Sequence, residues 1–147
     1  MTSCFHPKHL KDLSTFAPLE RGAGGLIVLT QDWRIARKLH EDASVLEHEF
    51  SVEVASPVEE AALNHLNKRI DLGNWGLSLL KVSVGSDSEQ VTRLRFALKG
   101  YQLGVVAALC EEVHWKLLAI KRLRLGRVAL AGLPEGQWRY LQDFERF

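Results

Sequence analysis

Residues 18–32 read PLERGAGGLIVLTQD, in which a charged pair leads through a glycine-rich turn into a run of apolar and β-branched residues. The three glycines permit positive φ angles and a close approach of the backbone to a ligand. Residues 26–30, LIVLT, predict a buried strand. The stretch therefore indicates an active-site loop that enters a sheet, with Glu20 and Arg21 at the entrance of the strand.

The bulk composition limits the class of protein. The chain has 147 residues, of which 46% are hydrophobic, and this is enough for one globular domain with its own core. Cys4 and Cys110 lie far apart, and no apolar run approaches the length of a membrane span. We therefore expect a cytoplasmic monomer that has no membrane partner. Cys4, His6 and His9 lack the second ligand pair of a structural zinc site, so no metal is expected.

Charge is distributed unevenly along the chain. The formal net charge is only +1, whereas nucleic-acid-binding domains are usually more basic. Between residues 90 and 127, however, Glu111 and Glu112 oppose a series of basic residues: Arg93, Arg95, Lys99, Lys116, Lys121, Arg122, Arg124 and Arg127. This basic half is compatible both with a solvated strand surface and with a phosphate-binding one.

Hydrophobic periodicity predicts strands and helices at irregular intervals. Strands are predicted over residues 26–30, 47–55, 77–84, 91–99, 115–125 and 127–130. Helices are predicted over residues 31–41, 56–69 and 102–112. The strands over 77–84 and 91–99 are expected to pair as a hairpin. Together the elements predict an α+β domain with a mainly antiparallel β-sheet flanked by helices.

The sequence also predicts the helix starts and the apolar faces of the first two helices. Thr30 is expected to cap the first helix, whose apolar stripe includes Trp33 and Ile35. Ser56 is expected to cap the second helix, with Pro57 at its first position.

The third helix, residues 102–112, carries no charge until its end and is predicted to be buried on most sides. Aromatic residues of the tail are expected to be packing anchors rather than a platform for bases: Trp138, Tyr140 and Phe144.

The order of these pieces resembles the catalytic domain of the bacterial ribosomal RNA pseudouridine synthases of the small-subunit (RsuA-like) family. PLERGAGGLIVLTQD is similar to the turn and "DSEGLLLLTND" strand of the family, and HEFSVEV at 48–54 resembles "KEYLVTV". GLPEGQWRYL at 132–141 resembles "GIPLGEWRDL". The resemblance covers residues 18–141. It implies a single pseudouridine synthase-like domain with residues 1–17 as a poorly defined lead-in. It also implies a core that lacks the N-terminal part and the small RNA-binding domain of the family.

The resemblance implies the isomerisation of uridine to pseudouridine in ribosomal RNA, without cofactor or metal, after the uridine has been turned out of the RNA stack. The nucleophilic aspartate of the family corresponds to Glu20, its active-site tyrosine to Phe50, and its carboxylate-binding arginine falls in Ala107–Ala108. Either Arg21 or a residue of the basic strand over 121–127 is a candidate substitute for that arginine. Phe50 keeps an aromatic surface for a flipped base but has no hydroxyl group for proton transfer.

The resemblance thus implies a set of site residues, and two further classes of function stay open. Glu20 and Arg21 are the implied catalytic residues, Phe50 and Gly25 the substrate contacts, and Lys121, Arg122, Arg124 and Arg127 the phosphate contacts. The first alternative is a catalytically degenerate RNA-binding module that retains the fold, because three catalytic positions differ at once. The second is a protein-interaction domain, which would be favoured if the apolar segment 105–109 were exposed.

Overall fold

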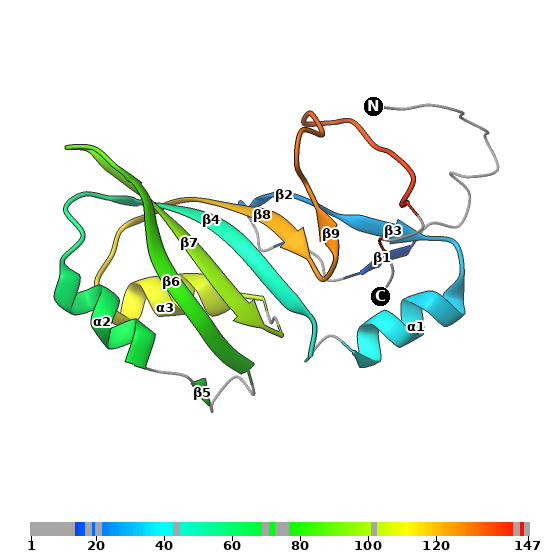
Figure 1. Cartoon of the computed structure of the whole chain (residues 1–147), viewed down its shortest axis with the longest axis horizontal. Helices are drawn as coiled ribbons and strands as arrows, with labels where there is room; N and C mark the ends of the chain where they lie inside the picture. The colour runs from blue at the N-terminus through cyan, green and yellow to red at the C-terminus, as the bar shows by residue number, and fades with distance from the viewer. Residues whose placement is uncertain are drawn as a thin grey trace.

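A seven-stranded sheet forms the centre of the computed structural model, which describes residues 14–16, 19, 22–42, 45–68, 71–72, 77–100, 103–142 and 145. Its strands follow the order β2-β8-β4-β7-β6-β5, and β9 pairs with β8 (Figure 1). The strands are β2 (Gly24–Gly25), β4 (Glu47–Ala55), β5 (Asp71–Leu72), β6 (Leu77–Asp87), β7 (Val91–Lys99), β8 (Leu117–Leu125) and β9 (Val128–Ala129). A separate two-stranded sheet joins β1 (Ser14–Phe16) to β3 (Val28–Thr30). The helices are α1 (Trp33–Glu41), α2 (Glu60–Lys68) and α3 (Val105–Glu112).

Antiparallel pairing dominates the large sheet. Pairing is antiparallel between β4 and β7, β4 and β8, β5 and β6, β6 and β7, and β8 and β9. Strand β2 pairs parallel with β8. Helices α2 and α3 lie on one side of this sheet (Figure 1), and their apolar residues pack into its main core. The predicted α+β class with a mainly antiparallel sheet is therefore confirmed.

The strand β4 lies between β7 and β8 and has the bounds predicted from its period-two pattern. The apolar side chains of Phe50, Val52 and Val54 are fully buried, whereas the alternating residues remain partly accessible. Because successive side chains of a strand point to opposite faces, this pattern fixes which face of the sheet meets the helices.

Two further sequence predictions are confirmed. Strands β6 and β7 form an antiparallel hairpin, as expected for 77–84 and 91–99. In α3, Val105, Val106 and Leu109 are buried in the core, so the helix is covered as predicted. The exposed apolar segment that would favour a protein-interaction domain is therefore not found.

The predicted buried strand over 26–30 is wrong in its extent. Within this range only β3, Val28–Thr30, is a strand, and it pairs with β1 in the two-stranded sheet, whereas β2 lies just before the range and belongs to the large sheet. Leu26 and Val28 are buried, whereas Ile27 and Leu29 are about half exposed, at 47% and 48%. The parallel pairing with β8 ends at Gly25, whose φ of 104° turns the chain away toward β1.

The predicted start and buried face of the first helix also need correction. Helix α1 begins at Trp33, and the carboxylate of Asp32 caps it by accepting a hydrogen bond of 2.9 Å from the Arg34 N–H. The Thr30 hydroxyl oxygen accepts a hydrogen bond of 3.1 Å from the Asp32 N–H. Thr30 therefore holds the capping residue in place and does not itself cap the helix. Trp33 is 69% exposed and Ile35 48% exposed, so this part of the expected apolar stripe does not enter the core.

The second helix starts later than predicted. Helix α2 begins at Glu60, and the Ser56-Pro57 peptide bond before it is cis. The Ser56 hydroxyl group shares a hydrogen bond of 2.7 Å with the hydroxyl group of Thr92 on β7, so it is engaged with the sheet rather than with the helix.

Candidate functional site

Gly25 meets Arg122 where β2 pairs with β8, and this contact fixes the position of the glycine-rich turn. A Cβ atom on residue 25 would overlap the backbone oxygen and nitrogen of Arg122, and the φ of 104° at this position is one that other residues rarely adopt. The following Leu26 N–H donates a hydrogen bond of 3.0 Å to the Arg122 carbonyl oxygen. Only glycine therefore allows this turn to lie so close to β8.

The side chain of Arg122 lies under the same turn. It is fully buried, and its Nε donates a hydrogen bond of 2.9 Å to the Leu26 carbonyl oxygen. Its cross-strand partner on β4 is Phe50. Burial of a cation lowers protein stability by several kcal/mol unless an opposite charge and hydrogen bonds compensate for its lost hydration. A fully buried arginine is therefore a candidate functional residue.

Arg122 was predicted to lie on a basic face as a phosphate contact, but its side chain is fully buried. The reason is a β-bulge. Arg124 faces Glu49 and Arg122 faces Phe50, so Leu123 is the extra residue on β8. This shift directs Arg122 to the helix side of the sheet and Arg124 to the opposite side.

His48 joins this buried group, although sequence reasoning gave it no role. Its ring is fully buried and stacks on the Phe50 ring, with centroids 6.2 Å apart and planes inclined by 4°. Burial, together with the positive charges of Arg122 and Arg124, lowers the pKa of His48 to about 3. The imidazole is therefore neutral near pH 7. His48 lies two residues before Phe50 in a strand, and side chains two residues apart in a strand point to the same face. This spacing could have predicted that the two rings lie together.

Phe50 was expected to offer a stacking surface to a flipped base. The structure places its ring in the main hydrophobic core with no exposed area. Its cross-strand neighbours are Phe96 on β7 and Arg122 on β8. The ring therefore forms one wall of the Arg122 environment, and a base would reach it only after neighbouring side chains had moved.

The other basic residues predicted for the site differ in their exposure and in whether they form ion pairs. Arg124 binds Glu49 at 2.6 Å and Glu47 at 3.1 Å, and donates to the Gly126 carbonyl oxygen at 2.7 Å. Lys121 and Arg127 are exposed. Two of the four predicted phosphate contacts are therefore accessible, one is held by carboxylates, and one is buried.

The two predicted catalytic residues, Glu20 and Arg21, lie outside the described part of the chain. The same holds for Cys4, His6 and His9, which were not expected to bind metal, and for Phe144, an expected packing anchor. Ala107 and Ala108, to which the resemblance assigns the position of the arginine of the family, are half-buried on α3. Within the described ranges no group of three metal-ligating side chains occurs. None of the helices that the structure describes is long and apolar enough to cross a membrane.

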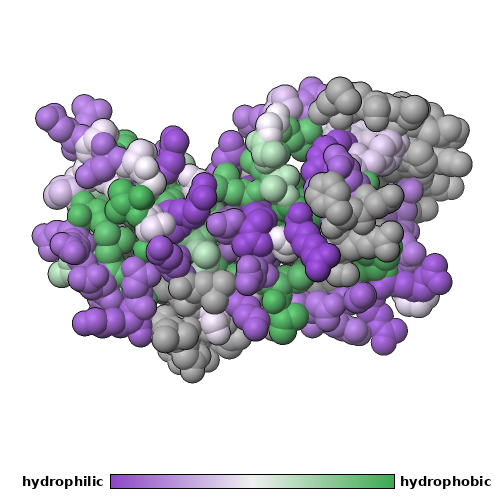
Figure 2. Space-filling model, in the orientation of Figure 1, coloured by the Kyte–Doolittle hydropathy of each residue, from purple (hydrophilic) through white to green (hydrophobic). Residues whose placement is uncertain are grey.

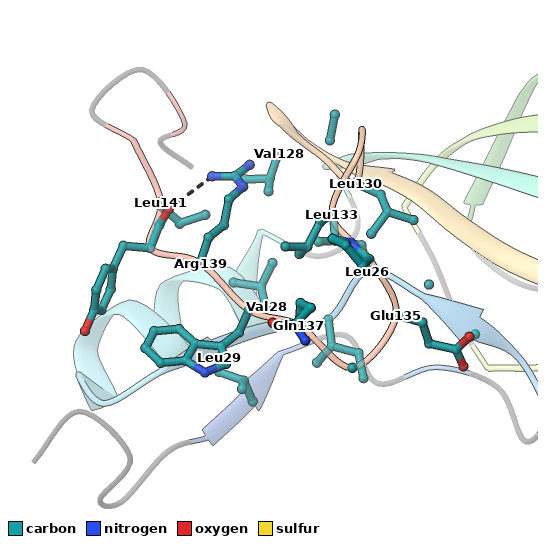
Figure 3. Close-up of a pocket in the computed structure, with 18 of the residues that line it drawn as sticks. Leu26, Val28, Leu29, Val128, Leu130, Leu133, Glu135, Gln137, Arg139 and Leu141 are labelled. Carbon is teal, nitrogen blue, oxygen red and sulfur yellow. Dashed lines mark hydrogen bonds between the residues drawn. The ribbon is translucent and has the colours of Figure 1, made fainter. Parts of the chain in front are cut away.

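A cavity of about 880 Å³ lies between the Gly24–Gln31 stretch and the C-terminal segment. Figure 3 shows Leu26, Leu130 and Leu133 close together on its wall. The tail is held by a paired contact in which Arg139 donates to both carboxylate oxygens of Glu145 at 2.6 Å.

Two aromatic residues of the tail, Trp138 and Tyr140, also line this cavity. Their rings pack edge to face with centroids 5.2 Å apart. They pack on each other, while Tyr140 remains 40% exposed.

Comparison with known proteins gives relatives among the pseudouridine synthases. The chain is 26% identical over 137 residues to the dual-specificity RNA pseudouridine synthase RluF of Escherichia coli (strain K12), which covers 93% of this chain and 46% of that protein. It is 30% identical over 123 residues to the ribosomal large subunit pseudouridine synthase B of Salmonella typhi, covering 82% of this chain and 41% of that protein. A crystal structure of a pseudouridylate synthase matches with a TM-score of 0.75 at 21% identity, over 96% of this chain and 61% of that one. The chain is a relative of the RNA pseudouridine synthases.

The resemblance to pseudouridine synthases predicted from sequence motifs is thereby confirmed, and the fold is theirs. The chain also matches the crystal structure of the archaeal box H/ACA sRNP Nop10-Cbf5 complex, with a TM-score of 0.63 at 10% identity. This second likeness concerns the fold alone. No family model matches the chain. The chain spans less than half the length of the two curated pseudouridine synthases described above.

Proposed function

We propose that this chain carries the catalytic core of an RNA pseudouridine synthase, with Glu20 as the carboxylate and Arg122 as the arginine that holds it. The observation that supports this most is the burial of Arg122 beneath the turn that follows Glu20, where its Nε is bound to the Leu26 carbonyl oxygen. The substrate is a uridine of ribosomal RNA. The protein acts as a cytoplasmic monomer and needs neither metal nor cofactor.

The reaction breaks the bond between ribose C1′ and uracil N1 and forms a bond from C1′ to uracil C5. The proton leaves C5, and N1 gains a proton, so the isomerisation is balanced without an oxidant or a reductant. A carboxylate is needed at the sugar during this exchange. If Arg122 holds Glu20 as proposed, its guanidinium group keeps the carboxylate ionised and oriented, because a charge-assisted hydrogen bond is stronger in a low-dielectric site.

Arg122 also offers a physical account of the missing arginine on α3. Ala107 and Ala108 cannot provide a charge, whereas β8 brings a guanidinium to the turn from another element. The neutral ring of His48 and the apolar ring of Phe50 border this guanidinium, so they add no competing charge. Without a hydroxyl group, Phe50 takes no part in proton transfer.

The proposal is tested by release of tritium from ribosomal RNA transcripts labelled at uracil C5. We expect release with the wild-type protein, none with Glu20→Ala, and retained or increased release with Glu20→Asp, which restores the shorter side chain of the family. If the wild type were as inactive as Glu20→Ala while still binding RNA, the chain would be a binding module without catalysis. The burial of Phe50 and the alanines at 107 and 108 are the observations that favour this second candidate.

A further inference from the structure

A row of polar side chains crosses the face of the sheet opposite α2 and α3. It consists of Lys121 on β8, Ser51 on β4, Arg95 on β7 and Ser83 on β6, and we call it the polar row. Ser51 pairs with both Lys121 and Arg95, and Arg95 pairs in turn with Ser83. Paired residues of neighbouring strands project from the same face about 4.8 Å apart. Cation and hydroxyl group therefore alternate across four strands.

The side chains of the polar row are accessible. Lys121 and Arg95 are exposed, and Ser51 and Ser83 are partly exposed. Figure 2 shows hydrophilic residues across the centre of the molecule in the view of Figure 1. Beside the row lies a hollow of about 320 Å³, whose lining includes both serines and two arginines, Arg93 and Arg95.

The charges around the polar row leave its cations available to an anion. Glu49 and Glu53 flank Ser51 on this face of β4, and Glu47 lies two residues beyond Glu49. An arginine outside the row engages each of these carboxylates. Glu47 and Glu49 bind Arg124, and Glu53 binds Arg93 at 2.7 Å. Across the described residues, the structure gives no ion pair to Arg95 or Lys121.

We propose that the polar row is a second RNA contact, which binds the phosphate backbone on the face of the sheet opposite the buried Arg122 side chain. Phosphate oxygens accept hydrogen bonds from arginine, lysine and serine side chains, and such contacts fix the position of a nucleic acid without reading its bases. Serine hydroxyl groups can also accept from the ribose 2′-hydroxyl group. The inference rests on the proposed function only in taking RNA as the ligand.

The test measures the equilibrium affinity for a fluorescently labelled RNA hairpin with a uridine-containing loop, over a series of salt concentrations. The variant is Arg95→Glu. Its control is Lys68→Glu, which changes the net charge equally at an exposed position on α2. We expect Arg95→Glu to raise the Kd about fivefold to tenfold at low salt and to lower the slope of log Kd against log salt by about 0.7. Lys68→Glu should leave both close to wild type.

Two further variants keep failure of this inference separate from failure of the proposed function. Glu20→Gln should lose tritium release and keep the wild-type Kd, whereas Arg95→Glu should raise the RNA concentration needed for half-maximal release. Arg95→Gln, with its fold checked by thermal unfolding, should raise the Kd about threefold because one phosphate contact is lost. The inference is overturned if Arg95→Glu and Lys68→Glu change the Kd equally, or if neither Arg95 variant changes it.

Discussion

Gly25 lies so close to the backbone of Arg122 that no side chain fits between them. This contact joins residues that are far apart in the chain and ties the glycine turn after Glu20 to the strand that carries the buried guanidinium. The site therefore depends on a parallel strand pair of only two residues on each side.

The first prediction concerns this contact. Gly25→Ala should lower the free energy of unfolding by about 2 to 3 kcal/mol, because the methyl group meets the Arg122 backbone and the positive φ is strained. Gly24→Ala is a matched control, since no atom lies within 4 Å of a Cβ added there. Chemical denaturation of both variants measures the difference. Equal losses of stability would contradict the close approach at residue 25.

The second prediction concerns the buried guanidinium. Arg122→Met keeps much of the side-chain volume but removes the charge, so tritium release should fall by about a hundredfold or more if this group orients the carboxylate. Arg122→Lys should recover little, because an ammonium group cannot reproduce the planar fork of a guanidinium. Arg124→Met, which removes only partly exposed ion pairs, should lower stability by about 1 kcal/mol at most and keep activity. Full activity of Arg122→Met would contradict the role of Arg122.

The third prediction is a pH dependence of stability caused by His48. Its folded pKa of about 3 lies below the ordinary value of 6.5, so between these values the unfolded chain binds the proton and the folded chain does not. Stability should therefore be constant above about pH 6.5 and fall as the pH is lowered toward 3. At about pH 4.5 the loss should amount to about 3 kcal/mol. Urea denaturation of the wild type and His48→Gln should show a shallower pH slope in the variant, and identical slopes would refute the assignment.

The fourth prediction tests whether α3 is a core element rather than an interaction surface. Leu109→Ala should lower the free energy of unfolding by about 2 to 4 kcal/mol, because the truncated side chain leaves a cavity in the main core. Leu103→Ala is the comparison, because Leu103 is 55% exposed and should cost about 0.5 kcal/mol or less. A small effect at residue 109 would indicate that the helix leaves the core in solution.

The sequence by itself determined the elements whose pattern is local. The alternation in Glu47–Ala55 predicted β4 with its bounds, and the apolar residues of α3 predicted its burial. Both succeed because side chains within one element report directly on the face that meets the core. The motif resemblance located the candidate carboxylate by the same kind of evidence, that is, by residues close together along the chain.

The tertiary structure decided what depends on distant pairing. Alternation alone would place Arg122 and Arg124 on one face of β8, whereas the bulge at Leu123 separates them into a buried arginine and one that is partly exposed and bound by carboxylates. Similarly, the run over 26–30 was expected to be one strand, but the pairing with β8 ends at Gly25 and only Val28–Thr30 forms a strand, which belongs to the small sheet. Register and bulges arise from contacts between segments many residues apart, and no local period encodes them.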